Sequence, residues 1–389
     1  MRIRKSNSRQ SGKKVANRLR VCVVTFPFTE AFVTPLSNLV EILRSLSGGI
    51  CVVTAGVEDA TITTNRGIQT YRIHQKKVKN IFARIAEYIR IQIRISFTLV
   101  MLSRDTDIYV FFMEAGAFLP MLTARLAGKK VVWELPSSLV QMVEHHKDPL
   151  SNALVWIQSV DYRLSNRIVL YSENLIRKWG LGKYRSKISI ACEYFLDFDE
   201  FKMQKPLNER GNLIGYIGRL SGEKGILNFM EAIPMVMETR EGVTFLIGGD
   251  GQLRPQVEEY ANKSGNKVKF VGWISHDKLP GYLNELRLLV VPSYTEAGPY
   301  VAFEAMACGT PVLGTPVGLM ADMLSDAENG FIMEDNSPEC IARNIVRALN
   351  HPDLEQVARN ARNLAEREFT FEKAVDSYSG ILENLRQRG

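Results

Sequence analysis

Short apolar runs alternate with helical stretches along this chain of 389 residues, and the alternation starts again near its middle. The runs are rich in β-branched residues and lack polar alternation, which is typical of strands buried on both faces of a parallel sheet. The helical stretches between them are long enough for crossover connections. The sequence therefore predicts an α/β fold of two facing, doubly wound, Rossmann-like domains. A ligand should lie in the cleft between them, at the carboxyl ends of the strands.

The expected elements fall into two groups. The first comprises strands at residues 19–25, 50–54, 108–112, 131–133, 168–171 and 188–191, and a helix at residues 35–46. The second comprises strands at residues 212–217, 243–248, 268–271, 288–291 and 311–314, and helices at residues 226–239, 252–264, 276–285 and 300–308. From residue 338 onward the pattern is helical, with breaks near residues 350–352 and 370.

The domain boundaries follow from where these patterns stop and restart. Residues 1–18 form a basic tail that we expect to be disordered, and no apolar segment of a secretory signal follows it. The first domain spans residues 19–196 and the second spans residues 212–370. Residues 197–211 are polar and contain a proline, as expected of a linker.

The net charge of +7 is divided unevenly between the halves of the chain. Residues 1–200 hold 29 Lys and Arg against 17 Asp and Glu, whereas residues 201–389 hold 20 against 25. A basic half attracts nucleic acid, anionic lipid or phosphorylated substrates. Nucleic acid is not the predicted partner, because basic motifs interleaved with aromatic residues are missing. Five scattered cysteines indicate a reducing compartment, so a cytoplasmic location is expected.

The most informative segment is residues 292–316, PSYTEAGPYVAFEAMACGTPVLGTP. A strand ends before it, and a helix begins near residue 300. The backbone N–H groups of residues 300–302 and the positive end of that helix are suited to bind a phosphate. Glu304 lies one turn inside and points back toward the helix start, where it can bind a vicinal diol such as a ribose. Glu296 can hold a sugar hydroxyl; the alternative is that both carboxylates are solvated surface groups.

A second segment, residues 215–225, follows the first strand of the second domain and reads GYIGRLSGEKG. Arg219 and Lys224 lie there at the carboxyl end of a strand, where two cations can converge on a diphosphate. The alternative is an ordinary surface turn. Glycines at residues 248–251 and 272 would let a nucleotide lie close to the backbone.

Together these motifs resemble those of the retaining glycosyltransferases of family 4, which have the GT-B fold of two facing Rossmann-like domains. One matching piece is the pair Glu296 and Glu304, with seven residues between them, in the segment that continues as EAMACGTPV. The others are the GR-x(4)-KG turn at residues 218–225, the GGDG turn at residues 248–251 and the NGF turn at residues 329–331. They occur in the family order over residues 212–350. The resemblance also implies that the final helix, residues 371–389, returns to the first domain.

The resemblance implies metal-independent transfer of a sugar, with retention, from a nucleotide-sugar donor to a hydroxyl acceptor. The donor is a co-substrate, and no cofactor or metal is expected. The acceptor would be a glycolipid, a lipid-linked acceptor or a cell-surface glycan. The implied catalytic residues are Glu296, Arg219 and Lys224. The implied donor-binding residues are Gly218, Arg219, Lys224, Gly249, Asp250, Gly298, Pro299, Tyr300, Val301 and Glu304.

The sequence departs from the family pattern on the acceptor side. Where many relatives carry a Gly-Gly pair after the first strand, residues 26–32 read FPFTEAF, so Phe28 would form an aromatic wall. Glu134 stands where many relatives place a histidine; it would contact a hydroxyl near the reacting centre, or else pair with a neighbouring cation. In the second domain Ala297 replaces a usual glycine, and residues 317–320 replace a more usual Gly-Gly pair.

Two alternatives to transfer remain open. A nucleotide-sugar epimerase would need paired acid and base residues, for which Glu114 and Glu134 are the available pair. A non-catalytic nucleotide-sugar-binding protein would retain the second-domain motifs but not transfer. A dehydrogenase is disfavoured, because residues 26–32 contain no G-x-G-x-x-G motif.

Residues 79–104 are basic and apolar, with Glu87 as the one acid before residue 105. The favoured interpretation is a helix packed on the first sheet. The alternative is a helix that lies on an anionic membrane surface and delivers a lipid-linked acceptor. With the basic tail, the sequence predicts peripheral contact with the cytoplasmic face of a membrane.

Overall fold

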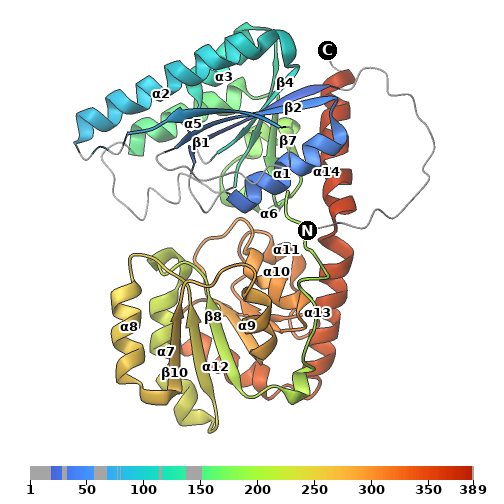
Figure 1. The fold of residues 1–389 in the computed structure, drawn as a ribbon. Coiled ribbons are helices and arrows are strands. Elements are labelled where there is room, and N and C mark those ends of the chain that lie inside the picture. Colours follow the sequence, from blue (N-terminus) through green and yellow to red (C-terminus); the bar gives the residue numbers. More distant parts are fainter. Residues whose placement is uncertain are drawn as a thin grey trace, which may run out of the picture.

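The computed structural model describes residues 19–28, 33–56, 68–76, 78, 80–113, 116–136 and 151–387. Two α/β domains lie one above the other, and each is built around a parallel sheet (Figure 1). The expected two-domain, doubly wound architecture is therefore confirmed.

The N-terminal domain contains a sheet of seven parallel strands in the order β3-β2-β1-β4-β5-β6-β7. Its strands are β1 (Arg20–Phe28), β2 (Gly49–Gly56), β3 (Gln69–His74), β4 (Ile108–Phe112), β5 (Lys130–Glu134), β6 (Arg167–Leu170) and β7 (Ile188–Ile190). Its helices are α1 (Val33–Leu46), α2 (Ile81–Leu102), α3 (Phe118–Leu126), α5 (Ser151–Leu164) and α6 (Asn174–Lys178). All five residues of β4 are buried, as expected of a strand covered on both faces.

The C-terminal domain contains a sheet of six parallel strands in the order β10-β9-β8-β11-β12-β13. Its strands are β8 (Leu213–Ile217), β9 (Thr244–Gly248), β10 (Val268–Gly272), β11 (Leu288–Val291), β12 (Val312–Gly314) and β13 (Phe331–Ile332). Its helices are α7 (Ile226–Thr239), α8 (Arg254–Lys263), α9 (Leu279–Glu285), α10 (Tyr300–Ala307), α11 (Met320–Met323), α12 (Pro338–Leu349) and α13 (Leu354–Glu368). The next helix, α14 (Phe371–Gln387), packs on the N-terminal domain.

Two strands were not expected from the sequence. β3, QTYRIH, is a sheet edge with mostly polar, partly exposed residues, so it lacks the continuous apolar signal of the other strands. β13 has two residues and is too short for any periodicity. β1 continues to Phe28, so the loop expected to begin after residue 25 starts later.

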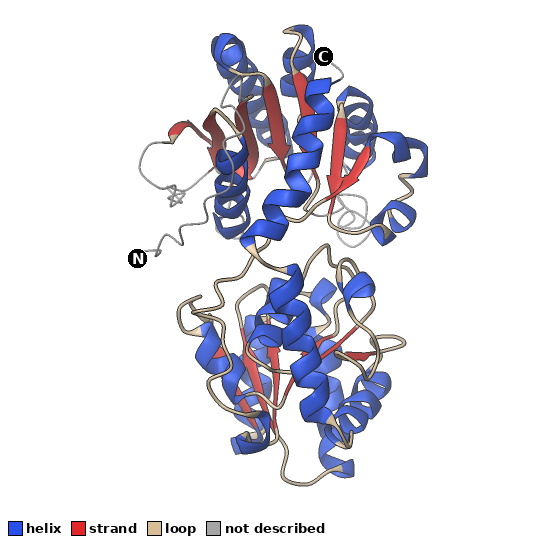
Figure 2. Ribbon diagram, turned by 90° about the vertical axis from the view of Figure 1, so that its right-hand side faces the viewer, coloured by secondary structure: helices blue, strands red, loops and turns tan. Residues whose placement is uncertain are grey.

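The chain crosses between the domains twice, and the two crossings touch. The backbone N–H of Leu196 donates to the carbonyl of Phe369 at 2.9 Å, and the rings of Phe195 and Phe371 pack edge to face. Beyond the second crossing, α14 runs from the boundary between the domains up along the N-terminal domain, toward the end marked C in Figure 2. It packs on α1 and contributes residues such as Tyr378 to the core beside the N-terminal sheet.

Both sheets have the same switch in strand order. β1 and β4 in one sheet, and β8 and β11 in the other, are neighbours although two strands separate them in the sequence. Loops that leave such a pair of strands diverge and open a crevice at their carboxyl ends. The loops after β8 and β11 hold most of the predicted site residues.

Candidate functional site

Three loops of the C-terminal domain meet at the carboxyl ends of β8, β9 and β11, and glycines allow the contact. A Cβ on Gly249, which has φ +133°, would lie 1.8 Å from the carbonyl oxygen of Gly218. A Cβ on Gly225, with φ +72°, would lie 2.0 Å from the carbonyl oxygen of Pro292. Only glycine fits at such close backbone approaches with positive φ. The predicted glycines at 218 and 249 thus join two of these loops.

Lys224 and Glu296, both predicted catalytic residues, form an ion pair across this junction. The Lys224 Nζ donates to Glu296 Oε1 at 2.7 Å, and Ser293 Oγ donates to the same oxygen at 2.9 Å. The side chains are 23% and 10% exposed, respectively, so the pair is largely shielded from water. Arg219 is more open: its Nη1 lies 3.7 Å from Glu223 Oε1, and its side chain is 57% exposed.

The N-terminus of α10 faces the same junction. Its N-cap residue, Pro299, provides no side-chain hydrogen bond to the first turn. The N–H of Ala302 donates to the carbonyl of Pro299 at 2.9 Å, so the expectation that three N–H groups are free is wrong for this one. Tyr300 and Val301 are half-buried at the helix start. The anion site predicted at the positive end of the helix therefore rests on the N–H groups of its first two residues.

Glu304 is buried inside α10 and is held by a histidine. Its side chain is 6% exposed, and its Oε1 lies 3.2 Å from His276 Nε2. The other ring nitrogen of His276 lies 3.9 Å from Glu200. The hydrogen bond with Glu304 raises the pKa of His276 above its usual value. The sequence left His276 unassigned, since nothing local connects it to a carboxylate 28 residues away.

The loop before α10 is braced from both domains. The methyl group of Ala297 is buried in the core cluster of the N-terminal domain, and a Cβ on Gly298 would lie 3.5 Å from the Tyr171 ring. The N–H of Leu319 donates to the carbonyl of Ala297 at 2.7 Å. The two departures from the family pattern noted at residues 297 and 317–320 therefore contact each other.

Asp250 lies at the surface and has local partners. Its Oδ1 accepts from the N–H of Gly251 at 2.8 Å, and its Oδ2 lies 3.4 Å from Arg254. Asp250 thus fixes the turn that carries Gly249.

Lys178 is a further cation near the site that the sequence did not indicate. It is the last residue of α6, in the N-terminal domain. Partial desolvation lowers the pKa of Lys178, and the negative charge of Glu296 opposes that change. A cation of the N-terminal domain therefore acts electrostatically on the loop before α10.

The acceptor-side candidates are placed differently from expectation. The side chain of Phe28 lies outside the described residues, as does Glu114. Glu134 is fully buried at the end of β5, where the hydroxyl of Tyr378 in α14 donates to it. Neither expected role fits, because no hydroxyl of a substrate reaches a carboxylate with no exposed surface, and its partner is a tyrosine rather than a cation.

A second buried carboxylate, Glu193, lies beside Glu134. It accepts hydrogen bonds from Tyr171, at 2.7 Å, and from Tyr300 at the start of α10. Burial raises the pKa of Glu193, although both tyrosines oppose the rise. Burial and the nearby Glu193 raise the pKa of Glu134 well above its usual value. No local motif indicates Glu193, whose partners come from three separate segments.

We expect Glu134→Gln to stabilise the protein at high pH. A carboxyl whose pKa is raised on folding contributes stability that is present below its unfolded pKa and lost as the pH rises through the folded pKa. Glutamine keeps an acceptor for Tyr378 but never ionises. The Tm of Glu134→Gln should exceed that of the wild type by about 2–4 °C at pH 8 and match it near pH 4.5. As the control, Glu383→Gln, at an exposed position of α14, should have the same Tm as the wild type at both pH values. An equal Tm for Glu134→Gln and the wild type at pH 8 would contradict the assignment.

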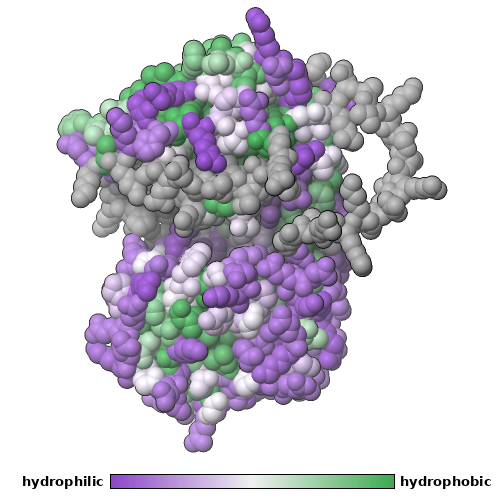
Figure 3. All heavy atoms as spheres, viewed as in Figure 1, coloured by the Kyte–Doolittle hydropathy of each residue, from purple (hydrophilic) through white to green (hydrophobic). Residues whose placement is uncertain are grey.

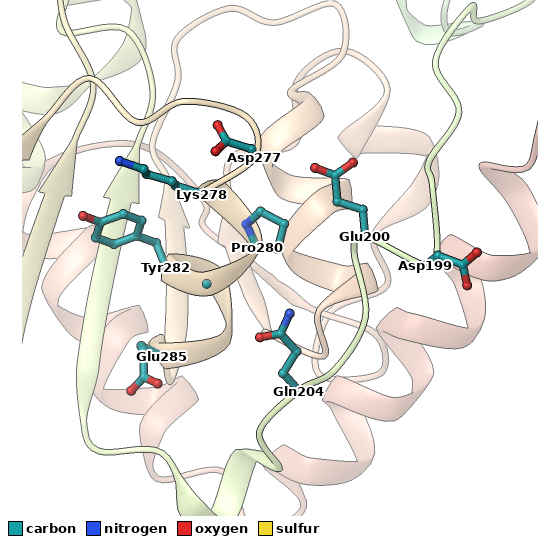
Figure 4. Close-up of a pocket in the computed structure, with 9 residues that line it drawn as sticks. Asp199, Glu200, Gln204, Asp277, Lys278, Pro280, Tyr282 and Glu285 are labelled. Carbon is teal, nitrogen blue, oxygen red and sulfur yellow. The ribbon is translucent and has the colours of Figure 1, made fainter. Parts of the chain in front are cut away.

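Figure 4 shows a separate pocket of about 660 Å³ beside the linker and α9. Its lining includes four carboxylates, those of Asp199, Glu200, Asp277 and Glu285, against one cation, Lys278. A diphosphate would be repelled there. Its lining therefore does not fit the diphosphate of the donor, although Glu200 connects it to His276 beside Glu304.

Neither a metal cluster nor a membrane span was found in the part of the chain that the structure describes. No group of three or more His, Cys, Asp or Glu side chains there has the geometry to hold a metal ion. No helix among these residues is long and apolar enough to cross a bilayer.

Comparison with known proteins gives one family and many relatives. The family described as "Glycosyl transferases group 1" matches residues 197–364. The α-D-kanosaminyltransferase of Streptomyces kanamyceticus is 26% identical over 291 residues, which are 70% of this chain and 75% of that protein. The lipopolysaccharide 1,2-N-acetylglucosaminetransferase of Salmonella typhimurium is 26% identical over 197 residues, 48% of this chain and 52% of that protein. The match thus spans about half the length of the second relative.

The fold also has solved counterparts. Anabaena HepE, in complex with UDP and glucose, matches with a TM-score of 0.71 over 94% of this chain and 99% of its own, at 16% identity. The arrangement of two facing Rossmann-like domains is therefore the GT-B fold, as expected from the sequence.

Proposed function

We propose that this chain, whose residues 197–364 match the group 1 glycosyltransferases, transfers a sugar from a nucleotide-sugar donor to a hydroxyl group, with retention of configuration and without a metal ion. The observation that carries the proposal is the junction of the loops after β8 and β11. It brings Lys224, Arg219 and the N-terminus of α10 to one edge of the sheet, with Glu304 one turn inside. This arrangement combines cations for a diphosphate with a carboxylate for a diol.

The proposed mechanism is electrostatic. As the bond between the sugar and the diphosphate breaks, negative charge grows on the departing phosphate oxygens. Arg219, Lys224 and the helix end would stabilise that charge, and such preorganised donors contribute most in a site that excludes water. Lys224 pairs with Glu296 in this structure, so the proposal requires that it also reach the diphosphate. The acceptor hydroxyl would attack from the face that the leaving group vacates, and its proton would pass to the departing phosphate oxygen. We assign no covalent nucleophile.

Glu304 would hold the ribose of the donor. Its carboxylate is buried and oriented by His276, so it is positioned to accept hydrogen bonds from two neighbouring hydroxyls. HepE was solved with UDP, which makes UDP the first nucleotide to test.

Thermal shift against UDP, GDP, ADP and CMP tests the nucleotide site. We expect one nucleoside diphosphate to raise the Tm of the wild type, because a ligand that binds the folded state stabilises it. Glu304→Ala should weaken that affinity by roughly 10- to 100-fold, since it removes hydrogen bonds to a charged group. Glu231→Ala, at an exposed position of α7, serves as the control and should leave the shift unchanged. A full shift in Glu304→Ala would place the ribose elsewhere.

Transfer itself is tested with the sugar conjugate of the nucleotide that binds. NMR of the product should show the anomeric configuration of the donor, and a chelator should leave the rate unchanged. Binding without transfer to any hydroxyl acceptor would instead favour a non-catalytic nucleotide-sugar-binding protein.

We further propose a glycan or lipid-linked acceptor and a cytoplasmic location, at the membrane face. The lipopolysaccharide transferase among the relatives supports a glycolipid acceptor. All five cysteines are unpaired, which supports a reducing compartment.

A further inference from the structure

Helix α2 exposes apolar side chains and buries polar ones. Its outer face consists of Phe82, Ile89, Ile93, Phe97, Val100 and Met101, each between 50% and 78% exposed. These positions recur at intervals of three, four or seven residues and so form one stripe along the helix. The buried side of the same helix packs Ile91, Ile95 and Leu99 into the core of the N-terminal domain and also buries three polar side chains, those of Glu87, Gln92 and Ser96. The helix therefore has a second apolar stripe on its outer side, in addition to the apolar residues that it turns to the core as an ordinary surface helix does.

Hydrogen bonds on the inner side hold α2 in this orientation. Glu87 accepts from the N–H of Lys76 at 2.7 Å and pairs with Arg90. Gln92 donates to the carbonyl of Gly116, and its Oε1 accepts from the N–H of Leu119 at 3.2 Å. A rotation of the helix that buried the outer face would break these bonds and strand buried polar groups. The outer face is therefore a fixed feature of the domain.

The exposed charges of α2 are positive, and Asp105, the exposed acid just beyond its end, pairs with Arg20. Arg84 and Arg94 are exposed on α2, and Arg104 is exposed just beyond its end. The helix's one acid, Glu87, is buried on the inner side. An apolar stripe flanked by arginines complements a surface that is apolar inside and anionic outside.

The apolar surface extends past α2. Leu126, at the end of the neighbouring α3, is 80% exposed. In Figure 3 hydrophobic residues gather along the upper edge of the N-terminal domain, where Figure 1 places α2 and α3. Contiguous apolar surface of this kind marks an interaction site on a water-soluble domain.

We propose that the outer face of α2 docks the N-terminal domain on an anionic bilayer. The helix lies in the plane of the membrane, with its apolar stripe among the upper acyl chains and its arginines at the headgroups. This surface deepens the proposed function by fixing which side of the enzyme meets a lipid-linked acceptor, and that link rests on the proposed function. The docking of α2 on a bilayer does not depend on the proposed function.

Sedimentation of the full chain with lipid vesicles tests the proposal. Vesicles of phosphatidylcholine alone are compared with vesicles that contain phosphatidylglycerol. We expect binding to the anionic vesicles that weakens as salt is raised. Ile89→Ser/Phe97→Ser should lose at least about tenfold in affinity, because it interrupts the apolar stripe. Arg94→Gln/Arg104→Gln should lose about 5-fold per arginine on anionic vesicles and nothing on neutral ones.

A matched control uses Trp273, which is 72% exposed on the C-terminal domain. Trp273→Ser should bind vesicles like the wild type, and an equal loss in this variant would show that binding is unspecific. A wild type that fails to bind anionic vesicles overturns the proposal. So does a dimer, detected by light scattering, that Ile89→Ser/Phe97→Ser converts to a monomer, because a second copy would then cover the face.

The nucleotide thermal shift separates this proposal from the proposed function. We expect Ile89→Ser/Phe97→Ser to keep the wild-type shift, which also shows that the variant is folded. If nucleotide raises the Tm of the wild type but the wild type does not bind vesicles, the docking proposal alone is rejected. Vesicle binding without any nucleotide shift rejects the proposed function alone.

Discussion

Replacing Lys224 with Met is expected to lower the rate of sugar transfer by about 10²- to 10³-fold, the usual loss when one preorganised charge donor to a transition state is removed. The effect has two physical sources. The substitution removes a cation proposed to stabilise the departing diphosphate. It also leaves Glu296, with a side chain only 10% exposed, beside the diphosphate without its partner 2.7 Å away. Initial rates with the donor found by thermal shift measure the loss.

The control for this variant is another lysine in a comparable ion pair. Lys263 Nζ lies 2.6 Å from Glu259 on the surface of α8, where the side chains are 75% and 67% exposed. Lys263→Met should change the rate by less than about twofold, since an exposed pair of this kind contributes little. If Lys224→Met kept more than a tenth of the wild-type rate, Lys224 would not act on the diphosphate.

The double variant Lys224→Met/Glu296→Gln separates the two sources. Glutamine removes the uncompensated charge, so the Tm lost in Lys224→Met should recover. The transfer rate should not, because the cation is still missing. Recovery of both the Tm and the transfer rate would mean that Lys224 serves only to neutralise Glu296.

Replacing Gly249 with Ala is expected to destabilise the C-terminal domain by roughly 3–4 kcal/mol and to abolish nucleotide binding. The new methyl group would meet the carbonyl oxygen of Gly218 at 1.8 Å, and the residue would keep a φ of +133° that alanine avoids. The loops after β8 and β9 must then move apart, which also displaces Arg219. Thermal unfolding should show a Tm lowered by about 10 °C.

Gly265 provides a control that isolates the steric contact. It also has a positive φ, +60°, but a Cβ there would meet nothing within 4 Å. Gly265→Ala should cost about 1–2 kcal/mol for the backbone conformation alone, and nucleotide binding should persist. Equal losses in the two variants would show that backbone strain, not the contact with Gly218, sets the cost at residue 249.

Local patterns were sufficient to predict most of the strands and the residues at their ends, but not the polar edge strand β3 or the two-residue strand β13. β4, β11 and α7 occur at the predicted residues, because their buried, continuous apolar runs are unambiguous. Glu296 and Glu304 lie just before and inside a helix, as the segment around them predicts. Glycine turns directly after apolar strands indicate a strand end without any knowledge of the partner.

The environments of single side chains could not be predicted in this way. Glu134 receives its hydrogen bond from Tyr378, 244 residues later, and Glu304 is oriented by His276 from another loop. The sequence contains no signal for either pair, since long-range partners are set by the packing of whole elements. The same applies to α2. Its mixture of apolar and basic residues was evident, but which side faces the sheet depends on hydrogen bonds from residues 76, 116 and 119.

The return of α14 to the N-terminal domain has a consequence for synthesis on the ribosome. Most of that domain's chain is complete by residue 196, yet Tyr378, Leu382 and Leu385 belong to its core. At ~5–20 residues per second, the sheet must wait roughly 10–40 s for the helix that covers it. During that interval an apolar strip beside α1 is bare, and the carboxyl of Glu134 has not yet received its hydrogen bond. Residues translated after the C-terminal domain therefore complete the N-terminal domain, and a nascent chain that stalls before them leaves the N-terminal domain unfinished.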